Sequence, residues 1–116
     1  GSTNDLLDHP QGIYVNPNGS SIYVADMWNS RIQLWNQNAR QGITVAGSQA
    51  GIAGNDSQHL NYPNDVTIDE ETQVVYVIDT SNNRVQRWRP SALQGDTIVG
   101  GNGKLTAKYS RSFALV

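Results

Sequence analysis

The sequence contains no cysteine, a single methionine, a single phenylalanine and no long hydrophobic run. Without cysteine, the 116-residue chain cannot hold a disulfide, a thiol nucleophile or a thiolate-bound zinc ion, although this leaves the cellular compartment open. No apolar run approaches the roughly 18 residues that a membrane-spanning helix requires, and the first residues do not have the pattern of a signal peptide. We therefore expect no membrane partner for this sequence.

Charged residues are also sparse, at 16% of the chain, and they give a net charge of −2. Residues 1–100 carry 5 basic and 10 acidic side chains, whereas residues 101–116 carry 3 basic and no acidic ones. Arg84, Arg87 and Arg89 flank Trp88, and the three basic residues of the tail, Lys104, Lys108 and Arg111, lie near Tyr109 and Phe113. Basic residues interleaved with aromatic ones are typical of nucleic-acid binding. Because the overall charge is negative, a wide basic face is not expected, and RNA binding is only a minor alternative.

The chain is organised by an internal repeat. Sliding the sequence by 53 positions aligns residues 7–47 with residues 60–100 and gives 14 identities in 41 pairs. Most of the other apolar positions exchange one apolar residue for another, such as Ile13 for Val66. A fixed period of this length is typical of repeat architectures, so the fold is interpreted as two copies of one unit.

Each unit is predicted to consist of four short strands separated by turns. In the first unit, we expect strands at residues 12–15, 21–25, 31–35 and 43–46. These segments are rich in β-branched and aromatic residues, and the Asn-Pro-Asn-Gly sequence at 16–19 is typical of a turn. No segment shows a helical period longer than one or two turns. The fold class is therefore all-β.

The second strand of each unit is apolar on both sides, at residues 22–25 and again at 74–78. A sheet with one wet face would alternate between apolar and polar residues, so both faces of each sheet must be covered. Antiparallel four-stranded sheets that are covered on both faces and repeat at this spacing are typical of β-propeller blades. We expect two blades, at residues 7–47 and 60–100, joined by a polar, Gly-rich linker at 48–59.

The two ends of the chain fall outside the repeat. Gly1-Ser2 resembles the remnant of a cleaved purification tag, and residues 1–6 are interpreted as this remnant and a leader. Residues 101–116 alternate apolar and polar side chains, which indicates either an extra edge strand or a frayed terminus.

Motifs that occur in both units resemble a known family. Leu-x-x-Pro begins each unit, at Leu7 and Leu60, and the second strand leads into Asp-x-x-Asn-x-Arg with a Trp four residues later. These repeated polar and aromatic residues are Asp26, Asn29, Arg31 and Trp35 in the first unit and Asp79, Asn82, Arg84 and Trp88 in the second. The pattern resembles the NHL repeat over residues 7–100. The resemblance implies a β-propeller, commonly with six blades.

Two blades in isolation would leave two apolar sheet faces bare, which would make them unstable or adhesive. Three copies of the chain would supply six blades, and a head-to-tail contact repeated about a threefold axis would close the ring. We expect a homotrimer that assembles into a six-bladed propeller. The alternative is that the chain is a piece of a longer propeller.

The repeated charged residues are interpreted as a turn-fixing network, because a catalytic set is rarely duplicated in every blade. Trp35 and Trp88 are assigned to packing between blades, with a platform for a sugar or peptide as the alternative. Met27 and Trp28 differ, because the second unit has Thr and Ser at these positions. An aromatic side chain that occurs in one blade only is a candidate contact for a protein or peptide ligand.

No metal site, cofactor site or catalytic set can be placed from the sequence. His9 and His59 stand at non-equivalent positions and lack a third ligand, which makes a poor zinc site. The favoured function is a non-catalytic module that binds a protein or peptide or assembles as a scaffold. The resemblance leaves one alternative, a metal-dependent hydrolase or lyase whose ligands, such as Asp65, Asp69 or His9, come from each copy around the threefold axis.

Overall fold

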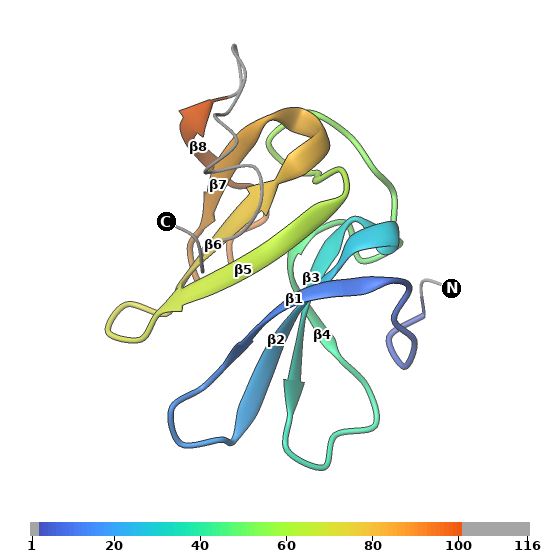
Figure 1. Cartoon of the computed structure of the whole chain (residues 1–116), viewed down its shortest axis with the longest axis vertical. Coiled ribbons are helices and arrows are strands. Elements are labelled where there is room, and N and C mark those ends of the chain that lie inside the picture. Colours follow the sequence, from blue (N-terminus) through green and yellow to red (C-terminus); the bar gives the residue numbers. More distant parts are fainter. Residues whose placement is uncertain (1–2, 101–116) are drawn as a thin grey trace.

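The structure, a computed structural model, describes residues 3–100 and contains two four-stranded antiparallel sheets (Figure 1). The first sheet has the order β1-β2-β3-β4, with strands Pro10–Val15, Ser21–Asp26, Arg31–Asn36 and Ile43–Gly47. The second has the order β5-β6-β7-β8, with strands Pro63–Asp69, Val74–Asp79, Arg84–Trp88 and Asp96–Gly100. The all-β fold and the four strands in each unit are confirmed. The predictions for residues 1–2 and 101–116 lie outside the described residues.

The turns follow from the local sequence. Between β1 and β2, the N–H of Gly19 donates to the carbonyl of Asn16 at 2.7 Å, and Gly19 has a φ of 74°, which glycine adopts without strain. β2 and β6 each lead into one turn of 3-10 helix, η1 at Met27–Asn29 and η2 at Thr80–Asn82. Neither turn, nor any other helix within residues 3–100, is long and apolar enough to cross a membrane.

The hydrophobic core lies between the two sheets. The first sheet contributes a face that carries Tyr23, Ala25 and Ile32, and the second sheet contributes Val66, Ile68, Val75, Val77 and Trp88. By the 53-residue equivalence, the core positions of the second sheet correspond to the opposite face of the first sheet. The sheets therefore pack front to back, with the same order of faces in each, as successive propeller blades do.

The innermost strands β1 and β5 lie side by side, and the outer strands β4 and β8 splay apart (Figure 1). A Cβ atom on Gly12 would lie 2.7 Å from both the backbone oxygen of Asn64 and the Cα of Asp65. Only glycine fits this approach of the two strands. In the second unit, Asp65 takes the position that Gly12 has in the first.

Candidate functional site

Asp26, at the end of β2, lies at the centre of a buried polar network. Its carboxylate accepts hydrogen bonds from the Nε of Arg31 at 2.8 Å, the Nδ2 of Asn29 at 3.0 Å and the backbone N–H of Asp8 at 2.7 Å. The Arg31 guanidinium also donates to the backbone carbonyls of Thr3, Leu6 and Gln49. The network therefore fixes the segment before the blade and the start of the linker against the β2–β3 turn.

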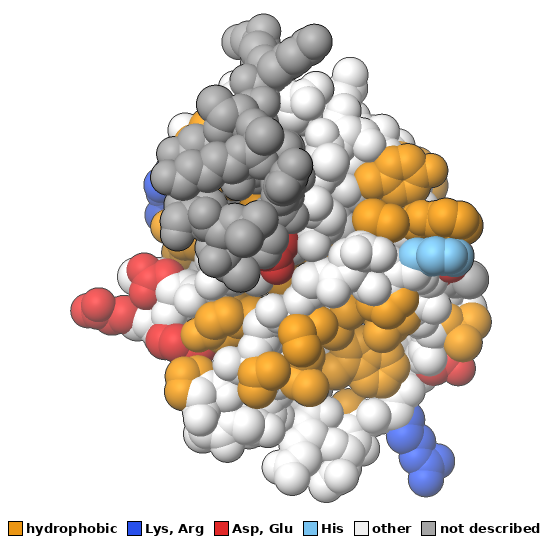
Figure 2. All heavy atoms as spheres, in the orientation of Figure 1, with side chains coloured by type: hydrophobic (Ala, Val, Ile, Leu, Met, Phe, Trp, Pro, Cys, Tyr) orange, Lys and Arg blue, Asp and Glu red, His pale blue; other side chains and the backbone are white. Residues whose placement is uncertain are grey.

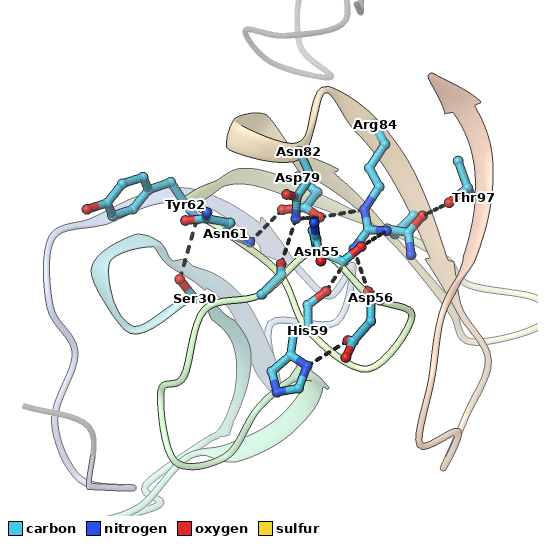
Figure 3. Close-up of polar contacts among 12 residues, drawn as sticks. Ser30, Asn55, Asp56, His59, Asn61, Tyr62, Asp79, Asn82, Arg84 and Thr97 are labelled. Carbon is cyan, nitrogen blue, oxygen red and sulfur yellow. Dashed lines mark hydrogen bonds and ion pairs between the residues drawn. The ribbon is translucent and has the colours of Figure 1, made fainter. Parts of the chain in front are cut away.

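The second blade repeats this network around Asp79 (Figure 3). Asp79 accepts from the Nε of Arg84 at 2.7 Å, the Nδ2 of Asn82 at 2.9 Å and the N–H of Asn61 at 2.7 Å. The Arg84 guanidinium donates to the carbonyls of Asn55, Asp56 and His59. Burial raises the pKa of the Asp79 carboxyl, and the three hydrogen bonds that it accepts oppose this rise.

Both networks bind polypeptide backbone, and their equivalence extends beyond the identities in the sequence. Thr3 and Leu6, whose carbonyls accept from Arg31, correspond at a spacing of 53 to Asp56 and His59. Residues 3–6, interpreted as part of a leader, thus pack on the first blade. The sequence carries no signal of this role, because the acceptors are backbone atoms and any side chain is compatible with it.

Trp28 is exposed over 52% of its surface, at the start of the β2–β3 turn. Its indole stacks on the imidazole of His9, with ring centroids 3.5 Å apart and planes inclined by 17°. The Nδ1 of His9 lies 2.8 Å from the carboxylate of Asp8, and this hydrogen bond lowers the pKa of Asp8. Met27 is half-buried. Trp28 is thus held in a fixed orientation, while Met27 offers less surface to a ligand.

A further aromatic side chain lies on the neighbouring blade. The backbone N–H of Tyr62 donates to Ser30 Oγ at 3.4 Å, which places Tyr62 next to the η1 turn that carries Trp28 (Figure 3). Tyr62 is exposed and is the counterpart of His9 in the second unit, with the same left-handed backbone, at φ values of 53° and 51°. We call His9, Trp28 and Tyr62 the aromatic rim. Sequence reasoning identified Trp28 as a contact candidate but considered His9 only as a metal ligand, because its stacking on Trp28 requires the fold of the first blade. Tyr62 was missed, because its place beside the η1 turn depends on how the blades pack.

The outer face of the first sheet is apolar and uncovered. In the strand register, Ile22 pairs with both Val15 and Trp35, and Ile13 pairs with Val24, so these residues share one face. Figure 2 shows a broad hydrophobic area over the strands of this sheet. We call Ile13, Val15, Ile22 and Trp35 the open face; Val24 lies on the same face but is buried.

The counterparts of the open face lie in the core. Ile13, Val15 and Ile22 are 57%, 48% and 38% exposed, whereas their equivalents Val66, Ile68 and Val75 are 2%, 6% and 4% exposed. The same contrast holds for the two repeated tryptophans, since Trp35 is half-buried and Trp88 is buried between the sheets. The open face thus has the composition of a blade-to-blade interface but no blade against it within residues 3–100.

The acidic and histidine residues considered as metal ligands are dispersed. Asp65 and Asp69 lie four residues apart on β5, a separation of about 13 Å for extended chain. His9 is stacked in the aromatic rim, and the Nδ1 of His59 lies 2.6 Å from the carboxylate of Asp56, whose pKa this hydrogen bond lowers. Across residues 3–100, no three His, Cys, Asp or Glu residues lie close enough to hold a metal ion.

The arginines around Trp88 do not form one surface. Arg84 is buried in its network, whereas Arg87 and Arg89 lie 3.3 Å and 3.8 Å from the same carboxylate oxygen of the exposed Asp96. The basic residues beyond Gly100 lie outside the part of the chain that the structure describes.

One polar contact between the blades had no signal in the sequence. The hydroxyl of Tyr14 donates to Glu70 Oε2 at 2.6 Å, and Asn16 Nδ2 donates to Glu70 Oε1 at 3.5 Å. The hydrogen bond to Glu70 raises the pKa of the Tyr14 phenol. Glu70 belongs to the β5–β6 turn, where charged residues are ordinary, so only the packing of the two blades reveals this contact.

Comparison with known proteins agrees with the repeated architecture. The sequence model of the NHL repeat matches residues 7–34 and 60–88. NHL repeat-containing protein 2 of Gallus gallus is 30% identical over 87 residues, and that of Bos taurus is 31% identical over 88 residues. In both cases the match covers 72% of this chain and 12% of the relative, so the chain spans about an eighth of these relatives' length.

Among solved structures, a candidate 6-phosphogluconolactonase from Bacteroides uniformis is similar, with 17% identity and a TM-score of 0.49. The match covers 87% of this chain and 28% of the other chain.

Proposed function

Because the chain belongs to the NHL-repeat proteins, we propose that it supplies two neighbouring blades of a closed propeller that serves as a non-catalytic, protein-binding scaffold. For the 116-residue chain by itself, three copies close a six-bladed ring. The open face is the observation that carries this proposal, since each of its residues has a buried counterpart in the interface between the two blades.

The partner for the open face is, in another copy, the face of the second blade that points away from the first blade; on that face Val99 is 39% exposed and Val85 is buried. That face carries Tyr76, Val85 and Val99 at the positions where the first blade uses Tyr23, Ile32 and Ala46 to contact its neighbour. The matching positions are apolar in both blades, so the contact within one chain can be repeated between chains. Asp65 replaces Gly12 at the closest approach, so the interface between copies has to be slightly wider near the ring axis.

A head-to-tail contact of this kind is heterologous, and such contacts form closed rings when the rotation per subunit divides a full turn. Six blades in a ring require 60° per blade, so one two-blade chain spans 120° and three chains close it. Covering the open face would remove its exposed Ile and Val side chains from water, at about 25 cal/mol for each Å² buried.

A non-catalytic role is supported by the way the buried charges are used. In both blades, the carboxylate, amide and guanidinium groups hold backbone and one another, which leaves the aromatic rim as the more accessible feature at this end of the sheets. Trp28 is large, rigid and oriented by His9, which are the properties of side chains that dominate binding to proteins and peptides.

The test of the assembly is the mass in solution, measured by light scattering coupled to gel filtration over a roughly hundredfold range of concentration. We expect a stable mass of three chains. A monomer with intact β-sheet circular dichroism at every concentration would contradict the trimer, and so would a dimer that persists across the whole range.

A further inference from the structure

A groove runs between the two blades on the side of the outer strands. A cavity of about 430 Å³ lies between β4 of the first sheet, with Ile43 and Val45, and the β7–β8 loop of the second, with Arg89 and Leu93. A second cavity of about 250 Å³ shares Val45 and Leu93 and continues along β4 past Trp88 to Gln49. The combined groove is open to solvent between two blades of one chain, so it exists whether or not copies assemble.

The groove has an apolar floor with a cation at one end. Tyr23, Val45 and Val75 line it, and Ile43 and Leu93 at its margins are exposed, Leu93 over 86% of its surface. The Arg89 side chain is 62% exposed, and its ion-pair partner, Asp96, is shared with Arg87 at a shorter distance. Two guanidinium groups against one carboxylate leave positive charge at this end of the groove.

The two repeats show that these side chains are not required by the fold. The β3–β4 turn at 36–40 and the β7–β8 turn at 89–93 share one conformation, since Ala39 and Ala92 donate to the residue three before them at 3.0 Å in each case. Their third residues have φ values of 64° and 61°. The first turn makes this structure with Asn36 and Arg40, where the second has Arg89 and Leu93.

The turn does not require Leu93, because the equivalent turn of the first blade forms with Arg40. The core does not require it either, because the Leu93 side chain is exposed. A single exposed leucine is ordinary, but here it stands over a groove with an apolar floor, beside a charge that the equivalent turn lacks. The pairing of an apolar slot with a cation is complementary to an apolar side chain that is followed closely by a carboxylate.

We propose that this groove binds an extended peptide segment of a partner protein, with a large apolar side chain against Leu93, Ile43 and Val45 and an acidic side chain on Arg89. An extended backbone fits a narrow slot between two sheets, and its alternating side chains place an apolar and an acidic group on the same side two residues apart. This site is separate from the aromatic rim and does not rest on the trimer.

The test is a selection of phage-displayed eight-residue random peptides on the immobilised full-length chain, followed by fluorescence anisotropy with the enriched peptides after synthesis and labelling. We expect enrichment of an apolar residue within two positions of Asp or Glu. Leu93→Arg and Arg89→Asn install the residues that the first blade carries in the same turn, so both variants keep the fold. Leu93→Arg is expected to weaken binding about tenfold or more. Arg89→Asn should weaken it less and reduce its dependence on salt.

Two control variants distinguish this site from other surfaces. Arg40→Leu, which makes the opposite exchange in the first blade, should leave binding unchanged, as should Trp28→Ala in the aromatic rim. Failure to enrich any peptide, or equal binding by the Leu93→Arg and parent proteins, would overturn the proposal. If only Trp28→Ala abolished peptide binding, the binding site would be the aromatic rim, which would also count against the groove. The solution mass of each variant is measured in parallel, so that a change in peptide binding can be distinguished from a change in oligomeric state.

Discussion

Asp79 and Arg84 form the buried ion pair that is best suited to test the polar network of the blades. Both side chains are nearly or fully buried, and the guanidinium also holds three backbone carbonyls. Asp79→Asn leaves the positive charge of Arg84 buried without its counter-ion, so we expect a loss of about 3–5 kcal/mol in the free energy of unfolding. Urea denaturation followed by circular dichroism measures the loss.

The control for this variant is Asp96→Asn, which removes an exposed partner of Arg87 and Arg89. Exposed ion pairs contribute about 0–1 kcal/mol, so this variant should unfold close to the parent protein. Equal losses in the two variants would mean that the network around Asp79 does not stabilise the blade as a buried pair.

The contact of Tyr14 with Glu70 makes a prediction about pH. Glu70 accepts a hydrogen bond from the phenolic hydroxyl of Tyr14 and so raises the pKa of Tyr14 above its ordinary value of 10.0. The protonated phenol is the form that makes the hydrogen bond, so its contribution to stability is present below pH 10.0 and is lost as the pH rises through the folded pKa. In NMR titrations of ¹³C-labelled tyrosine, Tyr14 should titrate above 10.0 in the parent and closer to 10.0 in Glu70→Gln. An unchanged titration would show that Glu70 does not cause the shift.

At the scale of strands and turns, the sequence predicts most of what is found, because each element is encoded twice. Positions that agree in both units, such as Asp26 with Asp79, indicate the strands and the polar networks without a structure. Contacts made by backbone atoms, such as the Leu6 carbonyl with Arg31, leave no such signal. Contacts across the two blades, such as Tyr62 beside Ser30, depend on relative placement and also could not be predicted.

Gly42 and Gly95 occupy equivalent turns in the two blades, so replacing each by alanine tests how the surroundings of a turn change the loss of stability. A Cβ on Gly95 would lie 2.5 Å from the Nε1 of Trp88, and a Cβ on Gly42 would lie 2.8 Å from the Nε1 of Trp35. Trp88 is buried between the sheets and cannot move aside, whereas Trp35 lies on the open face. Gly95→Ala should cost about 1–3 kcal/mol, as overpacking of a core does, and Gly42→Ala should cost less.

Urea denaturation of both alanine variants measures this difference. A larger loss for Gly42→Ala than for Gly95→Ala would mean that Trp35 is as constrained as Trp88. In the trimer the open face would be covered, and the losses in unfolding free energy for Gly42→Ala and Gly95→Ala would become similar. The two variants are therefore compared as monomers, either at a low protein concentration or with Val15→Lys added to both.

At the scale of the whole molecule, the arrangement of the blades predicts that the two ends of the chain are not interchangeable in assembly. Val15 lies on the open face, at the end of β1, where it is 48% exposed and pairs with Ile22, and its counterpart Ile68 is buried in the interface between the blades. Val15→Lys places a charge where the next copy would dock, and burying an unpaired charge is prohibitive. The variant should therefore remain a folded monomer by light scattering and circular dichroism. Ile52→Lys, at a position in the linker that is 58% exposed, is the control and should assemble as the parent does.

Mixing the variant with the parent chain distinguishes a head-to-tail contact from a symmetric one. In a heterologous contact, the substitution leaves the docking face of the second blade unchanged, so the Val15→Lys chain can still dock on the open face of a parent chain. A parent chain capped in this way cannot close the ring, and a titration with excess variant should convert trimers into open dimers of one parent and one variant chain. In an isologous contact both chains use the same patch, so the altered patch of the variant would take part in every pairing. The variant would then join no parent chain. Native mass spectrometry of the mixture identifies the composition of each species. Parent trimers that persist unchanged beside variant monomers after exchange has reached equilibrium would contradict the front-to-back ring.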